Sequence, residues 1–510
     1  MLQGWGPFCA LLVPQVRATL VPSPSEKAHA GLGSIPEPDR CGTLGTSFAE
    51  LSGVRLTFDR GTVVLTQDGD PLDLATVPGV LWDARVGVHR VRPYRCAALV
   101  AELRTKGVQV TDETTSYVRA ADEAFSSPAL RDYQETALQL WYAAGCRGAI
   151  VLPTGSGKTA VAIGAMARSR LPALCLVPTR VLLHQWRASL AQHYGGPIGV
   201  LGDGLRTIEA ITVATFESAF RTMERIGNRF GLLVVDEAHH FGSGIRDEAL
   251  EMCIAPTRLG LTATPPQGEA AARLIDLIGP VVYRLEVSDL AGGFLSSYDI
   301  VPVEIELNVD ERAAYEESLA IFRRTHRPFV ASNPGASWVD FVRAASQTDN
   351  GRRALAAWRR SKAILAFPSG KRRALSRLLE RHRDARVLVF TGDNETAYGI
   401  SRQHLIMPLT CDIGPAERAD TITRFREGKL RALVSAQVLN EGFDVPDAEI
   451  AIIVAGRLGE REYVQRVGRL LRPAPGKRAR IYELLALGTS AVHQAARMRE
   501  ALAPRRPSAA

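Results

Sequence analysis

The residues with the clearest chemistry form a glycine-rich loop, Pro153-Thr154-Gly155-Ser156-Gly157-Lys158-Thr159. It follows an apolar segment, 148–152, and precedes a run of helix-forming residues, 160–167. Glycines let backbone N–H groups turn inward around phosphate oxygens, and the N-terminus of the next helix adds partial positive charge. Lys158 can then reach the β- and γ-phosphates, and Thr159 can ligate Mg²⁺. Leu152 replaces the first glycine of the full pattern, but the strand–loop–helix context still predicts a nucleotide-phosphate site.

Two carboxylates follow a second apolar segment, at Asp236 and Glu237, 78 residues after Lys158. The carboxyl ends of parallel strands face the ligand-binding edge of a sheet. At that edge Asp236 would hold Mg²⁺, and Glu237 would orient or deprotonate an attacking water. Two acids after a strand are by themselves usually a solvated strand end or a helix cap. The phosphate loop earlier in the same predicted sheet favours the catalytic interpretation.

A third candidate set lies far along the chain, at Gln465, Arg469 and Arg472. The two arginines are three residues apart, so on a helix they share one face. Two guanidinium groups at a phosphate site can neutralise charge that develops during γ-phosphoryl transfer. In isolation an exposed basic helix face is the simpler interpretation. Because this region has no phosphate loop of its own, we favour an ATP site closed by arginines from a second lobe.

The elements that must position these residues are short apolar strands alternating with helical stretches. Continuous apolar strands with intervening helices indicate a parallel sheet covered on both faces. The alternation runs from 130 to 280 and returns from 386 to 487, which predicts an α/β fold with two parallel-sheet lobes. The expected strands are 148–152, 173–177, 211–215, 232–235 and 258–262 in the first lobe, and 387–390, 431–435 and 450–454 in the second.

Two further regions have a different character. Alternating apolar residues at 54–58, a turn, a second strand at 62–66 and a helix at 93–106 predict a small α+β module. Between the lobes, 310–366 looks helical. The predicted organisation is a flexible leader (1–45), the small module (46–125), the first lobe (126–300), a helical insertion with connector (301–370), the second lobe (371–500) and a tail (501–510).

Composition excludes several classes of protein. The 510 residues are 46% hydrophobic and 23% charged, which argues against a disordered or fibrous chain. The sequence contains no run of about 18 apolar residues, so we expect no membrane-spanning helix. The seven cysteines are scattered, so we expect neither a disulfide framework nor a zinc ribbon, and a cytoplasmic setting fits best. The net charge of the chain is +8, and residues 352–386 alone hold twelve basic and two acidic side chains. This concentration of positive charge suggests either a track that binds a polyanion or a solvated helix face.

Taken together, these motifs resemble those of superfamily-two helicases. In order along the chain the motifs are Leu130-Arg131-Asp132-Tyr133-Gln134, the phosphate loop, Val177-Pro178-Thr179-Arg180, the DEAH box Asp236-Glu237-Ala238-His239, Leu261-Thr262-Ala263-Thr264-Pro265, Val389-Phe390-Thr391, Val434-Ser435 with Glu441-Gly442-Phe443-Asp444-Val445-Pro446, and Gln465 to Arg472. They span about 130–475. Within that superfamily the chain is similar to the short prokaryotic members of the XPB (xeroderma pigmentosum group B) family. The stretches that carry this likeness are 81–87, 290–295 and 461–473.

The resemblance implies two RecA-like lobes, a damage-recognition-like domain in the small module and a thumb-like insertion in the helical segment. It also extends the predicted site. Gln134, in the motif with Arg131, should bond the adenine edge, and Gly442 and Asp444 should approach the nucleotide from the second lobe. Thr262 and Thr264 would link the nucleotide to lobe movement. The DNA backbone is expected at Thr179, Arg180 and Thr215, although hydroxyls at loop starts also commonly cap helices. Arg359 and Arg360 of the basic segment are further candidates for DNA contact.

The activity implied is ATP- and Mg²⁺-dependent movement on DNA, single-stranded or containing junctions, with 3'-5' polarity and a role in DNA repair. A nuclease partner is expected from prokaryotic members of the family. An Arg-Glu-Asp element associated with strand separation is missing after Thr264, so translocation is better supported than unwinding. An RNA-directed helicase, the motor of a restriction system and a non-catalytic nucleic-acid scaffold remain as alternatives.

Overall fold

In the part of the chain that the structure describes, the strands form three sheets, each explained by the pattern of apolar residues along its strands. A computed structural model describes residues 53–68, 73–118, 125–244, 246–290, 294, 297–410, 412–436, 448–454 and 478–500. One sheet is mostly antiparallel, and the other two are almost entirely parallel. The predicted α/β class with two parallel sheets is therefore confirmed. Within the described ranges no helix is long and apolar enough to cross a bilayer.

The small N-terminal module is a five-stranded sheet in the order β3-β4-β2-β1-β5. Alternation along β1 buries Val54 and Leu56 against α1, whose Leu99 and Leu103 complete the core. The predicted helix at 93–106 begins as a short 3₁₀ turn because Pro93 starts it. The elements are β1 (Gly53–Asp59), β2 (Thr62–Asp68), η2 (Leu74–Thr76), β3 (Val80–Asp83), β4 (Val88–Val91), η3 (Pro93–Arg95), α1 (Cys96–Thr105) and β5 (Gln109–Glu113).

The second sheet has eight strands in the order β13-β6-β12-β11-β7-β10-β8-β9, parallel except for the β8–β9 pair. Its strands are β6 (Arg147–Val151), β7 (Ala173–Val177), β8 (Ile198–Gly202), β9 (Leu205–Thr207), β10 (Ile211–Thr215), β11 (Leu232–Asp236), β12 (Thr257–Thr262) and β13 (Val281–Arg284). The connecting helices are α2 (Asp132–Ala143), α3 (Lys158–Ser169), α4 (Arg180–Ala191), α5 (Phe216–Ile226), η4 (Ala238–His240), α6 (Glu248–Glu251), α7 (Glu269–Leu277) and α8 (Val287–Leu290).

Helices cover both faces of this sheet, which explains why its central strands are continuously apolar. Cys175 and Val234 face a core shared with α2, α3 and α4, whereas their neighbours Leu174 and Val235 face α5, α6 and α7. All five residues of β7, β10 and β11 are buried. The five strands expected here are all present within one residue of their predicted ends.

The third sheet is wholly parallel, in the order β14-β19-β18-β15-β17-β16. Its strands are β14 (Ser297–Ile305), β15 (Val387–Phe390), β16 (Met407–Leu409), β17 (Ala432–Ser435), β18 (Ile450–Ile453) and β19 (Arg478–Ala486), with helices α12 (Ser369–Arg381), α13 (Asn394–His404), α14 (Pro415–Arg426) and α16 (Ser490–Glu500). The boundary at 300 between the predicted first lobe and insertion needs correction. It cuts β14, which pairs along its whole length with β19 and so is part of the third sheet.

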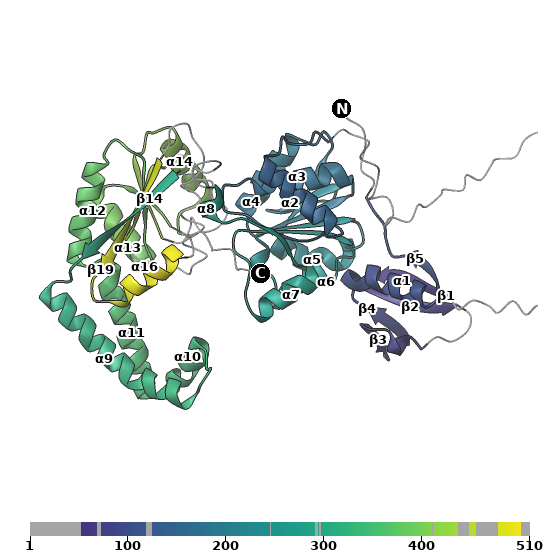
Figure 1. Cartoon of the computed structure of the whole chain (residues 1–510), viewed down its shortest axis with the longest axis horizontal. Helices are drawn as coiled ribbons and strands as arrows, with labels where there is room; N and C mark the ends of the chain where they lie inside the picture. The colour runs from purple at the N-terminus through teal and green to yellow at the C-terminus, as the bar shows by residue number, and fades with distance from the viewer. Residues whose placement is uncertain are drawn as a thin grey trace, which may run out of the picture. The chain divides into compact units, whose positions relative to one another are not determined.

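Three helices lie between β14 and α12: α9 (Val309–Ser332), α10 (Trp338–Ser346) and α11 (Asp349–Ala366). Figure 1 shows α9 and α11 as two long helices side by side, with α10 at their far end. Each begins with a side-chain cap, from Asn308, Ser337 and Thr348 respectively. α9 ends at Ser332 and α10 begins at Trp338. The segment expected to be helical is therefore helical.

A buried arginine ties the strands of the second sheet to the ends of two helices. Arg258, on β12, has no exposed surface. Its Nε donates to the Ala255 carbonyl at 2.9 Å and its terminal nitrogens donate to the carbonyls of Leu250, Cys253 and Leu277 at 3.1, 2.5 and 2.7 Å. Burial lowers the pKa of Arg258 to about 10. The carbonyls lie in or after α6 and at the end of α7, where a cation is favoured by the helix dipole.

We expect Arg258→Met to lower the free energy of unfolding by about 3 to 5 kcal/mol, because it leaves several buried carbonyls without donors. Urea unfolding followed by far-UV circular dichroism would measure this. Arg284→Met is the matched control, since Arg284 makes only a part-exposed ion pair with Glu286 and its loss should cost less than about 1 kcal/mol. Equal unfolding midpoints for the two variants would contradict the role given to Arg258.

Candidate nucleotide-binding site

The first-lobe residues predicted to do chemistry lie along one edge of the eight-stranded sheet. Because β6, β12, β11, β7 and β10 are parallel neighbours, their carboxyl ends share that edge. The phosphate loop follows β6, Thr262 ends β12 and Asp236 ends β11. Thr179 follows β7, and Thr215 ends β10. This edge is where ligands bind in open parallel sheets.

The phosphate loop is held in a conformation that requires glycine. Gly155 and Gly157 have φ of +85° and +81°, in the left-handed region. A Cβ on Gly157 would lie 2.5 Å from Nε2 of Gln134, so the space beside the loop is already filled. Ser156 is fully buried, and its hydroxyl donates to the Pro153 carbonyl at 2.7 Å. The helix α3 begins at Lys158, which directs its first N–H groups toward the loop.

Gln134 and Tyr133, at the start of α2, brace the loop from outside. Nε2 of Gln134 and the hydroxyl of Tyr133 both donate to the Ser156 carbonyl, at 2.7 and 2.6 Å. Oε1 of Gln134 accepts from the backbone N–H of Arg131 at 2.9 Å. The Arg131 guanidinium lies 5.7 Å from the ring centroid of Phe294. Here Gln134 supports the phosphate loop; its contact with adenine, and that of Arg131 with the nucleotide, stay predictions.

Asp236 is buried, with 6% of its surface exposed. Its Oδ2 accepts from the indole N–H of Trp186 at 2.8 Å, and its Oδ1 accepts from the Glu237 backbone N–H at 3.0 Å. Burial raises the pKa of Asp236 to about 6. The nearby Glu237 carboxylate adds to the rise, and the Lys158 ammonium opposes it. A carboxylate held at such a cost is poised to be stabilised by an incoming cation.

Glu237 has a strained backbone, with φ of +49°, and turns the chain sharply after β11. Its Oε2 lies 3.4 Å from Nδ1 of His239. The same ring nitrogen is 3.1 Å from the hydroxyl of Thr262, which in turn accepts from the Thr264 N–H at 3.2 Å. A polar chain therefore joins the end of β11 to the end of β12.

Several observations fit a bound nucleoside triphosphate. The Thr154 hydroxyl is buried and has no hydrogen-bond partner among the described residues. Lys158 Nζ makes only long contacts, 3.2 and 3.4 Å, with the carbonyls of Leu152 and Pro153. Mg²⁺ usually takes one or two protein ligands together with phosphate oxygens and waters. Asp236 and Thr159 offer such oxygens, and nowhere in the described chain do three or more His, Cys, Asp or Glu cluster as an independent metal site.

The candidates for DNA contact on this lobe also cap helices. The hydroxyl of Thr179 accepts from the Leu182 N–H at 3.3 Å and begins α4. The hydroxyl of Thr215 accepts from the Ser218 N–H at 3.2 Å and begins α5. Arg180 has 75% of its side chain exposed and lies 3.3 Å from Asp203 Oδ1. Gly442, Asp444, Gln465, Arg469 and Arg472 lie outside the described residues.

The basic segment 352–386 covers most of α11, all of α12 and the residues that lead to β15. Arg359 and Arg360 are exposed on α11 and make no ion pair with any other described residue. Lys371 needs correction as a surface charge: only 2% of it is exposed, and its Nζ donates to the carbonyls of Leu365 and Val454 at 2.8 and 2.5 Å. Burial lowers the pKa of Lys371 to about 7. It fixes α12 to the sheet rather than presenting a charge to solvent.

Three family models match the chain in succession. Residues 56–114 match the xeroderma pigmentosum group B helicase damage recognition domain. Residues 127–267 match the res subunit of type III restriction enzymes, and 370–474 match the helicase conserved C-terminal domain. The first sheet, the nucleotide-site sheet and most of the third sheet thus each have a family match.

Curated relatives align over most of the chain. A Sulfurisphaera tokodaii protein named DNA 3'-5' translocase XPB2 is 35% identical over 377 residues, covering 73% of this chain and 84% of that protein. The Mycobacterium tuberculosis DNA 3'-5' helicase XPB is 27% identical and covers 70% of this chain, which spans 60% of the mycobacterial protein. Among solved structures, the Pyrococcus furiosus Hef helicase domain has a TM-score of 0.50 at 18% identity, covering 72% of this chain and 98% of that one. That likeness is one of fold.

The raised pKa of Asp236 predicts a pH dependence of stability without nucleotide. A carboxyl group whose pKa is higher in the folded state contributes stability below its unfolded pKa of 3.8 and loses it as pH rises through about 6. Asp236→Asn removes this titration. The thermal midpoint of the variant minus that of the natural protein should therefore increase between pH 4 and pH 7. A difference that stays constant over this range would show that Asp236 is not destabilised by its surroundings.

Proposed function

The chain belongs to the XPB family of helicases, and from this we propose that it hydrolyses ATP to move along DNA or to remodel it. The observation that carries the proposal is the meeting, on one sheet edge, of the phosphate loop with the buried Asp236. Both lie within residues 127–267, which match the model of the res subunit of type III restriction enzymes. A scaffold without catalysis would have no need for a carboxylate buried beside a lysine in this way.

Different residues of this lobe would bind the phosphates, hold Mg²⁺ and activate the attacking water. The loop N–H groups and Lys158 bind the β- and γ-phosphates, and Gln134 and Tyr133 keep the loop in shape. Thr159 and Asp236 would hold Mg²⁺, which neutralises charge on the phosphates. Glu237, oriented by His239, would position the attacking water and accept its proton. Arg469 and Arg472 would complete the site from the second lobe, with Gln465, Gly442 and Asp444 near the nucleotide.

For the nucleic acid we propose DNA, with movement of 3'-5' polarity, as the names of the relatives describe for those proteins. We propose a role in repair because an Arabidopsis thaliana relative is named a subunit of general transcription and DNA repair factor IIH. Thr179, Arg180 and Thr215 would meet the backbone on the first lobe. On the second lobe, a cavity of about 560 Å³ is lined by Arg359, Lys362, Arg372 and Arg402 among others. Its acidic lining residues are Asp393 and Glu395, so cations outnumber acids there. This supports a phosphate-binding track that includes Arg359, with Arg360 exposed next to it on α11.

A second candidate is the motor of a nuclease system, since the nucleotide-site sheet matches a model described from type III restriction enzymes. Under this reading a separate nuclease partner would cleave while this chain supplies movement. Co-purification of a nuclease with the tagged chain would favour it. Comparing ATPase stimulation by DNA and RNA decides between DNA- and RNA-directed motors. The cytoplasmic location inferred from the cysteines stays a prediction.

We expect Lys158→Ala to lower the DNA-stimulated kcat for ATP hydrolysis by about 100- to 1,000-fold, because it removes a preorganised cation from the γ-phosphate. The rate would be measured by phosphate release with and without DNA. Lys106→Ala, on the exposed end of α1, is the control and should leave the rate unchanged. If the natural protein hydrolyses ATP no faster with any nucleic acid, the proposed motor function is wrong.

Reversing charge at Arg359 and Arg360 should flatten the salt dependence of DNA binding. If both contact phosphates, Arg359→Glu with Arg360→Glu should reduce the slope of log K against log salt by about 1.4 for single-stranded DNA. Fluorescence anisotropy at several salt concentrations would measure the slope. Reversal of Arg424 and Arg426, exposed on α14, provides a control of equal charge. An unchanged slope would contradict DNA binding by this segment and favour the interpretation as a solvated helix face.

A further inference from the structure

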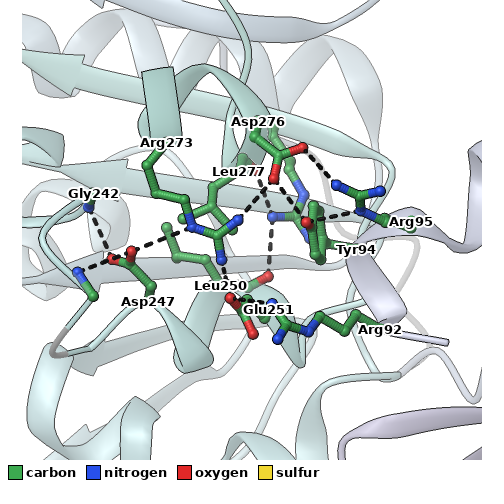
Figure 2. A network of polar contacts seen from close by, with 12 residues as sticks. Arg92, Tyr94, Arg95, Gly242, Asp247, Leu250, Glu251, Arg273, Asp276 and Leu277 are labelled. Carbon is green, nitrogen blue, oxygen red and sulfur yellow. Dashed lines mark hydrogen bonds and ion pairs between the residues drawn. The ribbon is translucent and has the colours of Figure 1, made fainter. Parts of the chain in front are cut away.

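One guanidinium group, that of Arg273 on α7, contacts carboxylates from three parts of the first lobe (Figure 2). Its Nη1 donates to Oδ2 of Asp276 on the same helix at 2.8 Å. Its Nη2 is ion-paired with Glu251 of α6. Its Nε lies 3.6 Å from Oδ2 of Asp247, just before α6. Arg273 is therefore a shared partner, and a shift of any one acid changes how it meets the other two.

The small N-terminal module binds two of these three acids. The hydroxyl of Tyr94 donates to Asp276 Oδ2 at 2.8 Å, and Arg95 reaches Oδ1 of the same residue at 3.4 Å. Arg92 donates to Glu251 at 2.9 Å. The Tyr94 ring is 5% exposed and lies 6.0 Å from the Arg273 guanidinium carbon. The module is thus attached to the same acids that hold Arg273 in place.

The third acid holds the loop that follows the DEAH box. Asp247 is 3% exposed, and its two oxygens accept from the N–H groups of Gly242 and Gly244 at 2.8 and 3.2 Å. Gly242 has φ of +93°, and a Cβ there would lie 2.3 Å from the Ala270 carbonyl, so the loop rests directly on α7. Only the short turn η4 and Phe241 separate Gly242 from Glu237.

We propose that Tyr94 and Arg273 are positioning residues, through which docking of the N-terminal module sets the placement of the turn from Asp236 to His240. The proposal rests on the ATPase activity proposed above. A purely adhesive contact needs only exposed ion pairs, which contribute little and act independently. Here the carboxylate that fixes the loop and the tyrosine that docks the module are both buried against one arginine. Such a network ties the position of one partner to that of the others.

The test uses the full chain and two conservative variants. Tyr94→Phe keeps the ring but removes the hydrogen bond to Asp276, and Asp247→Asn keeps one acceptor but removes the charge facing Arg273. Each should lower the DNA-stimulated kcat by about 2- to 30-fold with little change in KM for ATP. The fold-decrease in kcat of the double variant should be well below the product of the two single fold-decreases, because both substitutions act through Arg273. A decrease in kcat of the double variant equal to the product of the two single decreases would overturn the proposal.

A measurement that needs no ATP can test this coupling independently of the proposed ATPase function. Hydrogen exchange of the Gly242 and Gly244 amides should accelerate in Tyr94→Phe, while amides of β10 and β11 keep their protection. Arg221→Gln, which breaks an exposed ion pair on α5, should change neither exchange nor kcat. Unchanged exchange at the two glycines would overturn the coupling even if the protein is an active ATPase. Faster exchange in a protein that hydrolyses no ATP would uphold the coupling and reject the motor.

Discussion

The parallel register of β11 between β12 and β7 is the constraint on which the rest of this protein depends. It brings the last residues of neighbouring strands to one edge, so that loops distant in sequence supply a single site. Because both faces of the sheet are covered, the same register also buries Asp236 and leaves it to Trp186 for a hydrogen bond. The same register therefore shapes both the core and the site, and burial disfavours the charged form of Asp236, the acid that suits a bound cation.

Sequence patterns predicted the centre of each parallel sheet and missed its margins. Strands such as β7 are apolar throughout because they are buried on both faces, whereas the edge strand β14 is only half-buried and β16 has three residues. The phosphate loop and acidic pair were visible because their chemistry requires particular residues at short spacing. The roles of Trp186 and Tyr94 could not be predicted, because their hydrogen-bond partners lie 50 and 182 residues away and no local sequence pattern indicates such contacts.

Helix capping and DNA contact need not compete for the same hydroxyl. A threonine hydroxyl has one donor and two acceptor positions, and a cap uses only an acceptor. Thr179 therefore keeps a donor, beside the first N–H groups of α4, which favour an anion. Thr215 differs, since its hydroxyl donates to Ser218 at 2.9 Å. Of the two proposed backbone contacts, Thr179 is thus the one that the local geometry leaves ready for a phosphate.

The pairing of β14 with β19 has a consequence for how the protein is made. Ser297 lies opposite Arg478, so 181 residues must be synthesised before the edge of the third sheet closes. At roughly 5–20 residues per second, β14 emerges from the ribosome about 10 to 40 s ahead of its partner. The corresponding delay is shorter in the nucleotide-site sheet, where Arg147 of β6 lies opposite Arg258 of β12, 111 residues later, and all strands lie between residues 147 and 284. The nucleotide-site sheet can therefore fold first, while the unpaired β14 offers an open edge to chaperones or to other nascent chains.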